Sequence, residues 1–262
     1  MKRRRYLMDK DIPILDFDST RNAIIEPNKK GKLASIMPER AVLCFFYDVI
    51  AALVSDGMLE RIGELMSEIG PNPVYCMTYE GKSIAVLQPG VGAPLAAGFM
   101  EEMIALGAKK LVAVGGCGVL DADTEAGYAF VIESAIRDEG TSYHYLPAED
   151  RAEASPAATQ VIVDTLKQHQ VPFETVTSWT TDAIYRETIA RRDLRINQGC
   201  KIVEMEASAF FAVAAFRQVC FGQLVYGGDL VVPEGWDYRG WNDRKDDRMN
   251  LFHLAVEACS RL

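Results

Sequence analysis

The sequence lacks the features that would place the protein in a membrane, in a disulfide-bonded scaffold or on a nucleic acid. No run of about 18 apolar residues occurs, so we expect no transmembrane helix. The six cysteines are far apart and form no CxxC pair, which favours free thiols in a reducing cytoplasm. The formal net charge of −9 argues against a nucleic-acid surface that depends on bulk positive charge.

Metal and cofactor signatures are also missing. The three histidines, His144, His169 and His253, show neither HExxH nor HxH spacing, so a catalytic zinc is not expected. The glycine-rich turns lack the GxGxxG spacing of a dinucleotide fold, and no Walker A lysine follows them. We therefore predict no metal and no cofactor.

What remains is the composition of a soluble globular chain with a clear alternation of segments. Of the 262 residues, 49% are hydrophobic and 25% are charged, which excludes a disordered chain and allows a sizeable core. Short apolar runs lie at 23–25, 41–46, 83–87, 110–114, 128–132, 173–177, 201–203 and 224–226. Segments with helical spacing lie at 59–69, 95–106, 156–169, 207–216 and 247–260.

This alternation, with glycine turns between several of the segments, is typical of a parallel sheet with crossover helices. We predict an α/β fold: a single domain whose central sheet is mixed, mostly parallel and flanked by helices. The first strand is expected at 23–25, so the predicted division is an N-terminal extension over 1–22 and the domain over 23–262.

Ligands of open parallel sheets bind beyond the carboxyl ends of the strands. Four such ends carry informative residues: the turn 90–94, the turn 115–118, the acidic stretch 204–206, and Asp229. None of them is specific by itself, because glycine turns also arise from loop geometry alone.

Taken together and in order, these segments resemble the nucleoside phosphorylase and nucleosidase family. The stretch 203–209 (VEMEASA) matches the ribose-binding signature of that family, and 90–94 (GVGAP) resembles its phosphate loop. Residues 111–118 resemble the strand and glycine turn that follow, and 132–147 and 181–185 resemble its base-side segments. The resemblance implies the nucleoside phosphorylase-like fold and cleavage of an N-glycosidic bond.

The resemblance assigns the sugar and the proton transfer to acidic residues. Glu206 would accept hydrogen bonds from both ribose hydroxyls and favour the positive charge that develops on the sugar. Met205 would lie along the sugar face, and Glu204 would be a weaker second carboxylate. Asp229 would protonate the leaving base. The alternatives are a helix N-terminal charge for the two glutamates and a turn-capping role for Asp229.

The base pocket is also expected from the resemblance. Its predicted residues are Val91, Gly116, His144, Asp182, Ile184 and Tyr185, with the tyrosine stacking on the base. Uridine phosphorylases place a Gln and an Arg shortly after the last of these segments, where this sequence has Thr188 and Ala190. A purine or purine-like base is therefore expected in preference to uracil. Core packing is the alternative role for the apolar residues.

The acceptor site departs from the family pattern, because several of the expected arginines are missing. Gly90 and Gly92 would form the acceptor loop, and Lys29, Lys30 or Arg40 would supply cations for phosphate. In a nucleosidase, Glu26 would instead position a water molecule. Three hypotheses follow: phosphorolysis to the base and ribose 1-phosphate, which we favour narrowly, hydrolysis, and non-catalytic nucleoside binding. Expected partners are a nucleoside, phosphate as co-substrate, and further copies of the chain in a homodimer or homohexamer.

Overall fold

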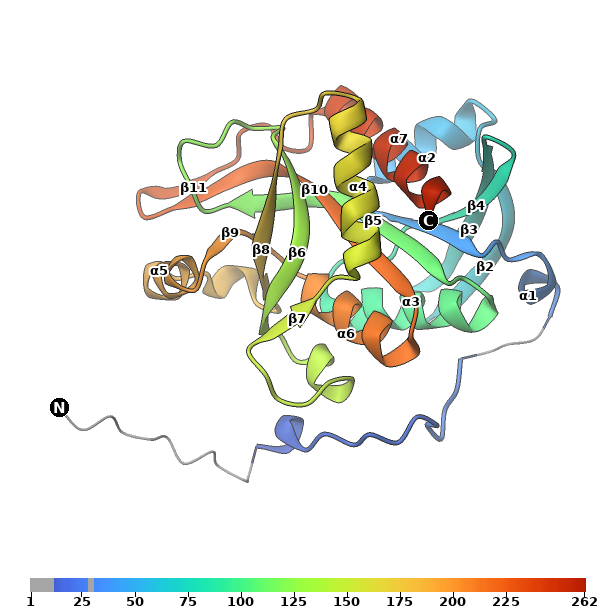
Figure 1. The fold of residues 1–262 in the computed structure, drawn as a ribbon, viewed down its shortest axis with the longest axis horizontal. Helices are drawn as coiled ribbons and strands as arrows, with labels where there is room; N and C mark the ends of the chain where they lie inside the picture. Colours follow the sequence, from blue (N-terminus) through green and yellow to red (C-terminus); the bar gives the residue numbers. More distant parts are fainter. Residues whose placement is uncertain (1–11, 28–30) are drawn as a thin grey trace.

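The computed structural model describes residues 12–27 and 31–262 (Figure 1), so Lys29 and Lys30 lie outside the described residues. The helices are α1 (Lys32–Ile36), α2 (Tyr47–Ser55), α3 (Ala93–Leu106), α4 (Pro156–Gln168), α5 (Ile189–Asn197), α6 (Ala207–Arg217) and α7 (Lys245–Arg261). The strands are β1 (Arg40–Cys44), β2 (Glu60–Ser67), β3 (Gly70–Tyr79), β4 (Lys82–Leu87), β5 (Lys110–Val119), β6 (Ala129–Asp138), β7 (Arg151–Glu153), β8 (Phe173–Thr181), β9 (Cys200–Glu204), β10 (Cys220–Val232) and β11 (Gly235–Asp237). Single turns of 3-10 helix are η1 (Pro13–Leu15), η2 (Thr141–His144) and η3 (Ile184–Arg186).

The central strands are apolar on both faces, which is why their sequences are continuous hydrophobic runs. In β1, Ala41 and Leu43 pack in one core cluster with α3 and α6. The intervening Val42 and Cys44 point the other way, into a second cluster with α2, α4 and α7. Alternate residues of a strand face opposite sides, so one short strand contributes to both cores. Helices therefore cover both faces of the sheet (Figure 1), as predicted.

The sheet is mixed, and part of it closes on itself. Its order is β11-β10-β6-β8-β9-β5-β1-β4-β3-β2, with β7 paired to β6. Because β10 also pairs with β5, the strands β5, β10, β6, β8 and β9 form a closed ring. Parallel pairs join β1 to β4 and β5, β5 to β10, and β8 to β6 and β9. Antiparallel pairs join β10 to β6 and β11, β5 to β9, β6 to β7, and β3 to β2 and β4, so parallel pairs of strands do not predominate in the described sheet as predicted. No helix in the described parts of the chain is long and apolar enough to cross a membrane.

The expected first strand at 23–25 is wrong. Ile24 and Ile25 are fully solvent-exposed there, and the sheet begins at β1. Residues 12–27 run along the outside of the domain (Figure 1), where the Arg21 guanidinium bonds to the carbonyl of Phe216 at the end of α6. The predicted domain start at residue 23 depended on that strand.

The expected helix at 59–69 is also wrong, because this segment forms β2 and the turn into β3. The pairing of β2 with β3 shifts register between Arg61 and Gly63. Such a bulge inserts one residue and interrupts the two-residue alternation of a strand. The apolar residues consequently acquire a spacing that resembles a helical one.

Two glycine pairs expected to end strands lie inside them instead. The strand β5 continues through 115–118, and β10 continues through Gly227 and Gly228. A Cβ on Gly118 would lie 2.9 Å from the Val203 side chain, and one on Gly228 would lie 2.9 Å from Trp241. These glycines allow neighbouring segments of the same chain to pack closely, and they do not form turns. The strands are longer than predicted, and Asp229 falls within β10.

Candidate active site

Glu206 lies where α6 begins, and it faces the glycine turn that follows β4. It is the N-cap residue of α6, but its side chain does not cap the helix. Its Oε1 instead accepts a 2.5 Å hydrogen bond from the backbone N–H of Gly92. Gly92 has a positive φ of 94°, a conformation that a residue with a Cβ rarely adopts. The structure thus brings together the predicted ribose-binding segment and the predicted acceptor loop.

Glu204 performs the helix-capping role that was the alternative for both glutamates. One of its carboxylate oxygens accepts hydrogen bonds from the hydroxyls of Ser178 and Thr180, at 2.9 and 2.6 Å. The other accepts from the backbone N–H groups of Glu206 and Ala207, at 2.8 and 2.6 Å. With both oxygens engaged in this way, Glu204 fixes the start of α6. Its carboxylate is committed to the protein rather than to a ligand.

The two buried glutamates differ in their electrostatic surroundings. Burial and, to a lesser extent, the nearby charge of Glu204 together raise the pKa of Glu206 to about 8, against the opposing backbone hydrogen bonds from Gly92 and Met205. Burial also raises the pKa of Glu204, but four hydrogen bonds to its oxygens lower it. The pKa values of both carboxyl groups are raised, and that of Glu206 is high enough for the group to hold a proton near neutral pH when no ligand is bound.

Asp229 lies near the carboxyl end of β10, where the pairing with β5 shifts register between Gly227 and Leu230, and it is close to Gly118 of β5. Its Oδ2 is 3.6 Å from the position that a Cβ on Gly118 would take. Gly118 pairs with Val203 of β9, the residue before Glu204. Asp229 and the acidic stretch 204–206 therefore lie at the same end of the closed ring. Asp229 is half-buried, and its Oδ2 accepts a 2.6 Å hydrogen bond from Nε1 of Trp236.

Glu187 is a carboxyl group that the sequence does not single out. It follows η3 and is half-buried. Burial and, to a lesser extent, the charge of Asp229 together raise the pKa of Glu187 to about 7. The fold thus places a second proton-holding carboxyl group near Asp229. Only its position after the base-side segment 181–185 could have drawn attention to it.

The base-side segment after β6 is anchored to α6 by buried polar contacts. Glu139 accepts 2.9 Å hydrogen bonds from the Ser208 hydroxyl and from the backbone N–H of Ser142. Gly140 donates its N–H to Asp182 Oδ2 at 2.8 Å. Asp182, predicted to contact the base, therefore anchors this loop through that oxygen. Arg137 donates to the Ser142 hydroxyl and to carbonyls at 146, 147 and 149.

The other predicted base-pocket residues lie at the surface of the single chain. Val91 is 70% exposed, Ile184 54% and Tyr185 95%. His144, the last residue of η2, is exposed as well. Gly116 is exposed on β5 and pairs with Tyr226. No core-packing role fits these apolar side chains, but one chain alone does not enclose a base with them.

Arg40, the predicted acceptor cation that lies among the described residues, does not reach the glycine turn. Arg40 begins β1, whereas the turn follows the carboxyl end of the neighbouring parallel strand β4, roughly 13 Å along the sheet. Glu26 bonds to the backbone N–H of Ala23, in the segment that contacts the far end of α6. That end is roughly 16 Å from Glu206 along the helix. The loop after the first strand is in fact 45–46, and Phe45 there packs against Phe210 of α6.

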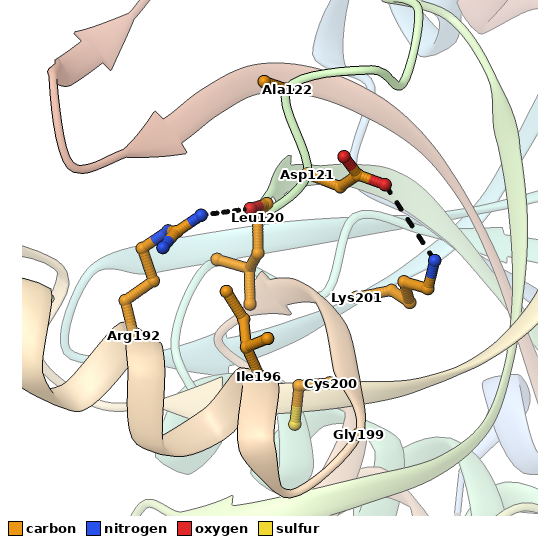
Figure 2. Close-up of a pocket in the computed structure, with 8 residues that line it drawn as sticks. All are labelled: Leu120, Asp121, Ala122, Arg192, Ile196, Gly199, Cys200 and Lys201. Carbon is orange, nitrogen blue, oxygen red and sulfur yellow. Dashed lines mark hydrogen bonds and ion pairs between the residues drawn. The ribbon is translucent and has the colours of Figure 1, made fainter.

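A separate hollow of about 350 Å³ lies beside α5 and contains none of the predicted site residues (Figure 2). Arg192 points into it but donates to the carbonyls of Leu120 and Val231, at 2.6 and 2.8 Å. Lys201 lies 3.9 Å from Asp121 and 3.7 Å from Glu174. Its cationic groups are thus already paired, so this hollow offers no cation to an anionic ligand.

Comparison of the sequence with known proteins identifies one family. The sequence profile described as "Phosphorylase superfamily" matches residues 40–260. A guanosine phosphorylase of Halorubrum lacusprofundi is 29% identical over 70% of this chain and 79% of its own. A uridine phosphorylase of Treponema pallidum is 29% identical over 78% of this chain and 84% of its own.

The fold is also found among solved structures. The purine nucleoside phosphorylase of Toxoplasma gondii, in complex with immucillin-H, superposes with a TM-score of 0.74 at 20% identity. The superposition covers 92% of this chain and 98% of that one. The predicted nucleoside phosphorylase-like fold, a mixed sheet with flanking helices in a single α/β domain, is thereby confirmed.

Proposed function

The chain belongs to the phosphorylase superfamily, and from this premise we propose that it cleaves the N-glycosidic bond of a nucleoside and transfers the ribosyl group to phosphate. The observation that carries the proposal is the placement of Glu206. Its carboxyl group is buried and accepts from the backbone N–H of Gly92 through one oxygen, and no side chain among the described residues bonds to its other oxygen. That oxygen is available to the hydroxyls of a bound sugar.

The proposed mechanism assigns one role to each acidic residue at this end of the ring. Glu206 holds the ribose hydroxyls and, once ionised by these hydrogen bonds, stabilises the positive charge that builds on the sugar as the C–N bond breaks. Asp229 gives a proton to the departing base. Glu204 holds the start of α6, and with it Glu206, in place through its four hydrogen bonds. We propose a purine as the base, because a protonating acid suits a poor leaving group.

Hydrolysis is the second candidate, and one observation favours it. The hydrogen bonds and ion pairs of the described residues bring no lysine or arginine to the turn 90–92. The loop after β1 and the first residue of α2 are aromatic, with Phe45, Phe46 and Tyr47 in sequence. Phosphate needs cations or several N–H donors, whereas a water molecule needs neither. The names of the two relatives favour phosphate, so the acceptor must be measured.

Product analysis tests the proposal. The protein is incubated with purine and pyrimidine nucleosides in buffers with and without phosphate, and bases and sugars are separated. Phosphate-dependent release with ribose 1-phosphate as the second product is the expected result. Phosphate-independent release of free ribose would replace phosphorolysis by hydrolysis. The Glu206→Gln variant, purified in parallel, controls for contaminating host enzymes. No release from any nucleoside by folded protein would leave only nucleoside binding.

A further inference from the structure

The hairpin of β10 and β11 places Trp236 beside Asp229. The register pairs Val231 with Trp236, in an antiparallel ladder that also joins Leu230 to Asp237. Directly opposite residues share a face, and so do residues two apart on one strand. Asp229, two residues before Val231, therefore projects on the same face as Trp236. The diagonal separation of such a pair is within reach of a long aromatic side chain.

The contact between these two side chains is a single, well-directed hydrogen bond. Trp236 Nε1 lies 2.6 Å from Asp229 Oδ2. An indole has one donor and no acceptor, so Trp236 has its only polar group in this bond. The ring itself is 63% exposed, and burial therefore does not oblige the indole to find a partner. Its edge packs on Tyr238 with ring centroids 6.0 Å apart, which holds its orientation.

Among the described residues, Trp236 is the one whose hydrogen bond to the Asp229 side chain is observed. Glu187 from the end of η3 and Cys117 of β5 are the titratable groups that sense its charge. Burial, then the charges of Asp229 and Glu204, raise the pKa of the Cys117 thiol, so it stays neutral. Its Sγ lies 3.3 Å from the carbonyl of Tyr226, not from Asp229. Within the described residues, no lysine or arginine pairs with Asp229.

We propose that Trp236 is a positioning residue, whose indole N–H occupies Oδ2 of Asp229 and so leaves Oδ1 as the oxygen that carries the proton to the leaving base. The inference rests on the proposed function. As the C–N bond breaks, its electron pair stays on the base, and the Oδ1 proton moves to a base nitrogen. The carboxylate that results accepts a charge-assisted hydrogen bond from Trp236, which is stronger than the bond before transfer. The indole thus favours the transition state over the bound substrate.

The test is Trp236→Phe, which keeps an aromatic ring and removes the N–H. Losing a hydrogen bond to a charged group corresponds to roughly a 10- to 150-fold lower kcat. We expect this loss on the purine nucleoside that the wild type cleaves fastest, with KM within about twofold, since the bond strengthens only in the transition state. On 4-nitrophenyl ribofuranoside, whose leaving group needs no proton, we expect little change. In an Asp229→Asn background the same substitution should cause no further loss.

Tyr238→Phe is the matched control, because it removes a hydroxyl that bonds to Asp243 at 3.3 Å and leaves Asp229 untouched. Equal losses on both substrates, or a rise in KM alone, would show that Trp236 only packs or stacks. Wild-type kinetics in Trp236→Phe would also overturn the inference while the proposed function stands. A wild type that cleaves neither substrate would instead remove the proposed function, and the inference with it.

Discussion

The backbone N–H of Gly92 and the carboxylate of Glu206 are joined by a 2.5 Å hydrogen bond, although the two residues are 114 positions apart. The bond connects the turn after β4 to the start of α6, so the proposed acceptor loop and the proposed sugar-binding carboxylate move as one unit. The bond uses one oxygen of the carboxylate, and the other oxygen remains for the hydroxyls of the proposed ribose.

Glu206→Gln tests the charge of this residue at nearly constant volume. The amide oxygen can still accept from Gly92, so we expect the fold to survive. Turnover should fall roughly 100- to 1,000-fold, the usual loss when one preorganised electrostatic group is removed. Steady-state kinetics on the preferred nucleoside measure it. Glu101→Gln is the control, since Glu101 is similarly buried but pairs with Arg217 at the other end of α6. Wild-type turnover in Glu206→Gln would exclude this residue from the chemistry.

The raised pKa of Glu206 predicts a pH dependence of stability. Burial holds this pKa at about 8 in the folded protein, against about 4.3 in an unfolded chain. The folded state binds the proton more tightly, so this contribution is complete below the unfolded pKa and is lost as pH rises to about 8. The Glu206→Gln variant has no carboxyl group at this position, so its stability has no such contribution to lose. We expect the Tm of the variant to rise relative to wild type between about pH 4.5 and 8 in thermal scans. A constant difference would show that Glu206 is ionised throughout.

Asp229→Asn tests the proton transfer. The amide cannot give up a proton to the base, so cleavage of purine nucleosides should fall by roughly 100-fold or more, in line with general acid catalysis. Ribosides with an activated leaving group should lose much less. Relative kcat values on the two substrates give the answer. A loss of equal size on both would assign Asp229 to structure or binding.

Ser208→Ala tests the anchoring of the loop after β6. The substitution leaves one oxygen of the buried Glu139 without its 2.9 Å partner. An unsatisfied buried acceptor destabilises a protein by about 1–3 kcal/mol. Urea unfolding should show a lower midpoint with an unchanged slope. Ser35→Ala, at an exposed hydroxyl that bonds only within its own helix, serves as the comparison. An unchanged midpoint in Ser208→Ala would mean that water replaces the hydroxyl.

Much of the architecture could be predicted, because the central strands and the long helices have strong periodic signals. The segments 83–87 and 95–106 lie within β4 and α3 as expected. The failures occurred where local pattern and tertiary packing disagree. A bulge gave β2 an apparent helical spacing, and close packing, not a turn, explains Gly118 and Gly228. Two exposed isoleucines gave the segment 23–25 the composition of a strand. The acceptor loop was therefore predicted about twenty positions before the loop that actually follows the first strand.

The site was predictable to the extent that short contiguous motifs carry it. The stretch 204–206 is local in sequence, but the separate tasks of Glu204 and Glu206 are not. They depend on Ser178 and Thr180 of β8 and on Gly92 after β4. Glu187 acquires its raised pKa only from burial and from Asp229, which lies on a different strand. No spacing in the sequence indicates that Glu187 and Asp229 lie close together.

The closed ring of β5, β10, β6, β8 and β9 fixes the positions of the acidic site residues, whereas the hairpin of β10 and β11 outside it can vary in sequence and length. A ring has no free edge, so a strand within it cannot slip without breaking pairs on both sides. Glu204 at the end of β9 and Asp229 on β10 therefore keep their relative positions. The strand β11, which carries Trp236, pairs with β10 alone and lies at the edge of the sheet. Insertions in this hairpin would leave the ring intact, so divergence in base preference among related chains should be concentrated there.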